Sequence, residues 1–158
     1  MSFSNNNELL DKHYCKQFNY NKLLKMIKIF ISLIRNLQLE LGDLDSIKIT
    51  AKYEMRYSNF VSTATNSVIE SFLIKDYKTE QQMNECISMF VKAYNNLSNV
   101  EKEVFYKVVM HNEKEAFIDL EHYYKVPFQR DISHIKQSAI IKFATFLRFH
   151  RMMDKVLK

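Results

Sequence analysis

The chain has 158 residues, 47% of them hydrophobic, which is enough for a packed core and argues against disorder throughout. One glycine (Gly42) and one proline (Pro127) are too few for a sheet-rich fold with many tight turns, so long helices are favoured. The net charge of +5 is a mild bias toward polyanions. The longest uncharged apolar run is far shorter than the roughly 20 residues of a membrane span, so we expect no membrane-spanning helix.

The cysteines and the N-terminus indicate the compartment. Cys15 and Cys86 are far apart in the sequence and form no CxxC pair, which is typical of reduced thiols in a cytoplasmic protein. Residues 1–7 are polar and rich in asparagine, without the basic and apolar regions of a signal peptide. We therefore expect a cytoplasmic, all-α protein.

A long helix is predicted from about residue 8 to residue 41, because apolar residues recur there at helical spacing. Its apolar face is wider than one neighbouring helix would cover, so the helix either packs centrally in a bundle or forms a subunit interface. Packing in the core is the first interpretation, and a homodimer through residues 22–41 is the second. Binding of a membrane surface through its lysines is a third. A polar stripe interrupts the apolar face at Lys25, Lys28, Ser32, Arg35 and Gln38.

Gly42 is predicted to end this helix, and a connector follows to about Phe60. Alternating apolar residues from Ile47 allow a short strand within the connector. A second helical stretch runs from about Asn66 to Asn95, with a break near Thr79, which can cap a restart.

Three further helices are predicted in the C-terminal third of the chain. Ser98 and Glu101 form the S-x-x-E pattern of a capping box, so a helix is expected to start at Asn99. A second capped helix follows from Asn112, and Pro127 favours a new helix from Phe128. Two short helices, a tight turn and a basic third helix are the layout of a helix-turn-helix DNA reader.

The third of these helices carries the chemistry suited to DNA. Residues 127–158 contain seven Lys and Arg against two Asp and Glu, an excess equal to the charge of the whole chain. Its apolar residues recur at three- and four-residue spacing, and the opposite face is polar. Arg and Lys reach guanine edges or phosphates, and Gln can pair with adenine, although an ordinary solvated face is the alternative. The candidate DNA-binding residues are Gln129, Arg130, Ser133, His134, Lys136, Gln137 and Lys142.

Two sets of residues carry a resemblance to a known family. They are Leu97-Ser98-x-x-Glu101-Lys102-x-Val104 and, after Val126 at the turn, Ile132-x-x-Ile135-Lys136-x-x-Ala139-Ile140-x-Lys142-Phe143-Ala144-x-Phe146-Leu147. This pattern resembles the fourth region of bacterial sigma factors and, more closely, the ArpU family of phage transcriptional regulators, which is related in style to the RinA activators. The resemblance implies a sigma-like helix-turn-helix, and an activator of phage late genes that acts with host RNA polymerase in the bacterial cytoplasm.

The sequence therefore predicts two modules: an N-terminal helical module (residues 1–96) for dimerisation or partner contact, and a helix-turn-helix DNA-binding domain (residues 97–158). The expected function is a transcriptional regulator that binds double-stranded DNA. The alternative is an all-α interaction module that binds another regulator through residues 22–41. No enzyme, cofactor or metal site is expected, because a Gly-rich phosphate loop is absent and the five His lack metal-ligand spacing.

Overall fold

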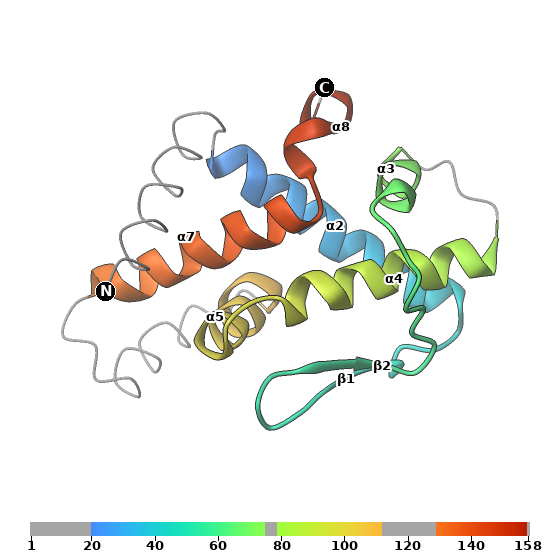
Figure 1. Ribbon diagram of the computed structural model, residues 1–158, viewed down its shortest axis with the longest axis horizontal. Coiled ribbons are helices and arrows are strands. Elements are labelled where there is room, and N and C mark those ends of the chain that lie inside the picture. The colour runs from blue at the N-terminus through green and yellow to red at the C-terminus, as the bar shows by residue number, and fades with distance from the viewer. Residues whose placement is uncertain (1–19, 75–78, 112–128, 158) are drawn as a thin grey trace.

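The computed structural model describes residues 20–74, 79–111 and 129–157. Helices dominate, as predicted, and the elements are arranged around α2, α4 and α7 (Figure 1). Among the described residues, no helix has both the length and the apolar character needed to cross a membrane. In chain order, the elements are α2 (Tyr20–Glu40), β1 (Ile47–Ile49), β2 (Met55–Tyr57), α3 (Ser67–Leu73), α4 (Glu80–Asn95), α5 (Asn99–Val104), the π-helix η1 (Phe105–Met110), α7 (Gln129–Phe146), the 3-10 helix η2 (Phe149–Arg151) and α8 (Met153–Val156).

Helix α2 ends at a left-handed glycine, as the sequence predicted. Gly42 has φ +70°, a conformation that costs a residue without a Cβ little. Its N–H donates to the Leu39 carbonyl at 3.0 Å, and the Asp43 N–H donates to the Gln38 carbonyl at 3.1 Å. These two bonds are those of a Schellman motif, which satisfies carbonyls that the helix end would leave unpaired.

The connector after α2 forms a two-stranded antiparallel hairpin, in which Lys48 lies opposite Arg56. The predicted single strand at Ile47 is confirmed as β1, and β2 was not predicted. The outer edge of β2 is fixed to α4, because the Asn95 side chain both accepts from the Met55 N–H and donates to the Met55 carbonyl, each at 2.9 Å. The hairpin is therefore held to the helices by hydrogen bonds as well as by apolar contacts.

The second helical stretch is divided into α3 and α4, and the restart at Thr79 is confirmed. The Thr79 hydroxyl accepts from the Gln82 N–H at 3.2 Å, while the Gln82 side chain accepts from the Thr79 N–H at 3.3 Å. Both halves of the capping box are therefore present.

One hydrophobic core joins the N-terminal and C-terminal parts of the described chain. Phe30 of α2 lies 5.8 Å from Phe90 of α4 and 5.6 Å from Phe149 of η2, measured between ring centroids. Phe143 of α7 stacks on Phe105 of η1 at 4.7 Å. The division between residues 1–96 and 97–158 therefore stays a prediction about function, because described residues on both sides of it pack together.

Candidate nucleic-acid interface

The two halves of α7 lie in different surroundings. In the N-terminal half, Ser133, His134 and Gln137 are exposed, and they occupy one face of the helix. Ile132 is fully buried against Val104 of α5, so the same turns are anchored to the fold on their other side. The exposed face belongs to a well-packed helix and presents three of the predicted DNA-binding side chains together.

Lys136 lies at the edge of this face, where α7 packs beside α2. It is half-buried, and its pKa lies below the usual value for lysine, because of desolvation and then of repulsion from the Lys28 ammonium group of α2. Within the described residues, neither lysine makes an ion pair with a carboxylate. The two helices therefore bring together positive charge that an external anion could neutralise.

Lys142 has a different environment from the exposed residues Ser133, His134 and Gln137. Its Nζ lies 2.8 Å from Oε1 of Glu101, whose side chain is 8% exposed. Glu101 Oε2 is also buried and has no hydrogen-bond partner among the described residues. Lys142 thus neutralises a buried carboxylate between α5 and α7, so its ammonium group is paired within the protein.

The predicted capping box at Ser98 is present in half. The Ser98 hydroxyl accepts from the Glu101 N–H at 3.3 Å, and α5 starts at Asn99 as predicted. The Glu101 carboxylate, which would complete the box, is instead paired with Lys142. Glu101 therefore connects the start of α5 to α7.

Several predictions lie outside the described part of the chain. The side chains of Gln129 and Arg130 belong there, although α7 itself starts at Gln129. So do the predicted helix from Asn112 and the turn at residues 125–127. Two of the three helices of the predicted helix-turn-helix, α5 with η1 and α7, pack against each other.

The C-terminal segment packs more closely than the sequence suggested. Arg148, Arg151 and Lys155 contribute to the basic excess of residues 127–158 that suggested attraction to DNA. Phe149 is instead fully buried, and Lys155 pairs with Glu70 of α3 at 2.7 Å. Arg148, in the left-handed region at φ 57°, makes the bend that turns this segment back onto α2.

The contribution of α2 to this surface was missed at the level of sequence. Lys22, Lys25 and Lys28 are visible as a basic run, but their position beside α7 depends on helix packing.

In residues 20–74, 79–111 and 129–157, no three His, Cys, Asp or Glu side chains are grouped to hold a metal ion. Comparisons with protein-family models, with characterised proteins and with solved structures find no significant match to this chain.

Proposed function

We propose that this chain is a DNA-binding transcription regulator that reads duplex DNA with the N-terminal half of α7. The observation that supports it best is the exposed face of Ser133, His134 and Gln137 beside Lys28 and Lys136, which pair with no carboxylate of the described residues. Gln and His offer donors and acceptors to base edges in the major groove, and the lysines suit phosphate.

The proposal divides the work between two helices. Ser133, His134 and Gln137 of α7 contact bases, and contacts by Gln129 and Arg130 stay a prediction of the sequence. Lys28 of α2 and Lys136 hold the backbone of the duplex. Lys142 is left out of the DNA contacts because its ammonium group serves Glu101.

The biological role rests on the resemblance to the ArpU and RinA regulators. On that basis we propose an activator of phage or mobile-element late genes that acts with host RNA polymerase in the bacterial cytoplasm. A homodimer through residues 22–41 stays a prediction of the sequence, and it competes with other partners for the surface of α2.

The test is a selection of binding sites from random duplexes with the purified chain, followed by a salt titration of the enriched sequence. We expect one enriched motif and an affinity that falls steeply with salt, because neutralised phosphates release counterions. The absence of any enriched motif, with only weak salt-dependent binding, would contradict sequence-specific reading by α7.

A further inference from the structure

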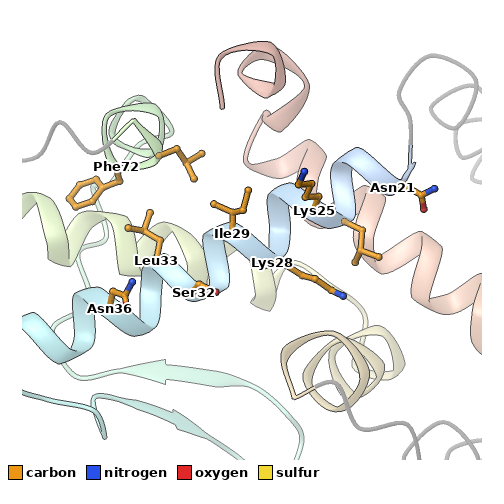
Figure 2. A pocket seen from close by; sticks show the side chains of 10 residues that line it. Asn21, Lys25, Lys28, Ile29, Ser32, Leu33, Asn36 and Phe72 are labelled. Atoms are coloured by element: carbon orange, nitrogen blue, oxygen red, sulfur yellow. The ribbon is translucent and has the colours of Figure 1, made fainter. Parts of the chain in front are cut away.

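A groove of about 620 Å³ runs along the outer face of α2, on the side where α3 lies (Figure 2). The α2 residues that line it recur every three or four positions, so they share one face of the helix. From Asn21 to Asn36 this face is about 22 Å long, at 1.5 Å per residue. The lining residues are Asn21, Leu24, Lys25, Lys28, Ile29, Ser32, Leu33, Asn36, Phe72 and Leu73.

The wall of the groove toward α3 is apolar. Leu33 lies on the same side of α2 as Phe72, and Ile29 lies one turn closer to the start of α2 (Figure 2). Phe72 is buried, Leu33 and Leu73 are half-buried, and Ile29 is 37% exposed. These side chains form an apolar floor of the groove that is partly accessible to solvent. Such a floor can accept an apolar side chain of a partner.

The charged groups of the groove are all positive. Lys25 and Lys28 are both exposed, and Lys28 points away from α3 (Figure 2). The only acidic residue of α2 is Glu40, its last residue, which does not line the groove. Among the described residues, no carboxylate pairs with either lysine. The groove is therefore complementary to a ligand that is apolar on one side and acidic on the other.

This combination selects among the kinds of occupant. A second copy related by a two-fold axis would set the lysines of one α2 against those of the other. DNA would gain nothing from a floor of Leu, Ile and Phe. The flat surface of a bilayer would contact the edges of the groove and would not reach the apolar residues inside it. A narrow amphipathic helix with an acidic flank satisfies both the floor and the lysines.

We propose that the groove between α2 and α3 binds an acidic amphipathic helix of a partner protein. Leucine-like side chains of that helix, spaced by three, four and seven residues, enter the floor beside Ile29 and Leu33. Its carboxylates lie along Lys25 and Lys28. About four helical turns of the partner would match the length of the groove. The proposal does not rest on DNA binding, although Lys28 is also part of the proposed DNA surface.

The test uses two designed, fluorescein-labelled helical peptides with the same leucine stripe. One carries glutamates beside the stripe and the other carries lysines at the same positions. Fluorescence anisotropy with the full chain is expected to show binding of the glutamate peptide, at least about tenfold tighter than that of the lysine peptide. Equal binding of the two peptides, or no binding of the glutamate peptide, would overturn the proposal.

Two variants localise the interaction. Ile29→Asp should weaken binding of the glutamate peptide by about tenfold or more, since it places a charge on the floor. Lys25→Glu should weaken it by about fivefold and bring the two peptides closer in affinity. Leu39→Asp and Lys48→Glu are the matched controls, because both side chains are exposed and neither lines the groove. Equal losses in the controls would contradict the assignment.

Two further measurements address the other occupants. Circular dichroism must show that Ile29→Asp keeps its helix content, as expected for a side chain at the surface. If that variant instead turns a dimer into a monomer in sedimentation, the occupant is a second copy and the proposal fails. It also fails if phosphatidylglycerol vesicles bind the chain and Ile29→Asp abolishes that binding.

Discussion

The two halves of α7 belong to one continuous helix but lie in different surroundings, one at the surface and the other in the core. From Ser133 to Gln137 the helix has an exposed polar face, and Ile132 is buried on its other side. From Ala139 to Leu147 most side chains are buried, among them Phe143, which contacts the rings of both Phe90 and Phe105. The core thus fixes the position of the exposed half, in the way that a rigid scaffold positions a binding surface.

The largest effect is expected in the buried half. Phe143→Ala removes a ring in contact with three other aromatic rings and should lower the free energy of unfolding by about 3–5 kcal/mol. Urea unfolding followed by circular dichroism measures this loss. Thr145→Ala is the control in the same half, since its side chain is exposed and the change should stay within about 0.5 kcal/mol. Similar losses in the two variants would remove the distinction between core and surface.

A variant of Lys142, in the C-terminal half of α7, tests whether this side chain stabilises the fold or contacts DNA. Lys142→Met leaves the buried Glu101 carboxylate without its ion-pair partner and should destabilise the fold by about 1–3 kcal/mol. The salt dependence of DNA affinity should not change, because this charge does not contact phosphate. A flatter salt dependence with unchanged stability would place Lys142 at the DNA instead.

In the exposed half, Gln137→Ala should weaken binding of the selected duplex by about 1–3 kcal/mol, the value of one base contact. Stability should change by less than about 0.5 kcal/mol, as for other surface positions. Fluorescence anisotropy and urea unfolding provide the two numbers. If stability falls and affinity does not, the residue has a packing role.

Lys136 separates phosphate contact from base reading. Lys136→Gln should reduce the slope of log affinity against log salt by about 1, with a similar loss for every DNA sequence. Lys48→Gln, at the exposed residue of β1, is the matched control and should leave the slope unchanged. A loss confined to one base position would instead make Lys136 a reader of sequence.

The smallest effect concerns pH. The pKa of His150 lies below its ordinary value of 6.5, because of burial and then of the neighbouring Arg151 and Arg148. The unfolded chain therefore binds a proton at His150 more readily than the folded protein does. The contribution of His150 to the free energy of unfolding is present above about pH 6.5 and is lost as the pH falls through the pKa of the folded state. Thermal unfolding of the wild type and His150→Gln across this range should show a weaker pH dependence in the variant. An identical pH dependence would exclude His150 as its source.

The sequence predicted those parts of the fold that depend on local chemistry. Gly42 and Thr79 marked helix ends correctly because left-handed glycine and capping boxes are decided within a few residues. β2 was missed because its pairing partner is several residues away. Ile27 and Ile31 belong to the wide apolar face predicted for residues 22–41, and both are buried in the core. Ile29 and Leu39 are the large apolar residues of α2 that are exposed, and the apolar pattern of the sequence does not distinguish them from the buried ones.

The candidate site could be predicted only in part, for the same reason. Helical periodicity placed Ser133, His134 and Gln137 on a polar face, and they are exposed. It placed Lys142 there too, because periodicity cannot reveal the carboxylate of Glu101, 41 residues earlier in the chain. The proximity of Lys28 and Lys136 likewise depends on how α2 packs against α7. Contacts between distant segments decided which charges are available.

The most direct test of reading by the exposed half of α7 is to repeat the DNA selection with a variant that carries His134→Ala and Gln137→Ala. We expect a motif that loses its preference at the base positions contacted by these side chains and keeps it elsewhere, with the fold intact by circular dichroism. A motif and an affinity identical to those of the wild type would show that this face of α7 does not read DNA.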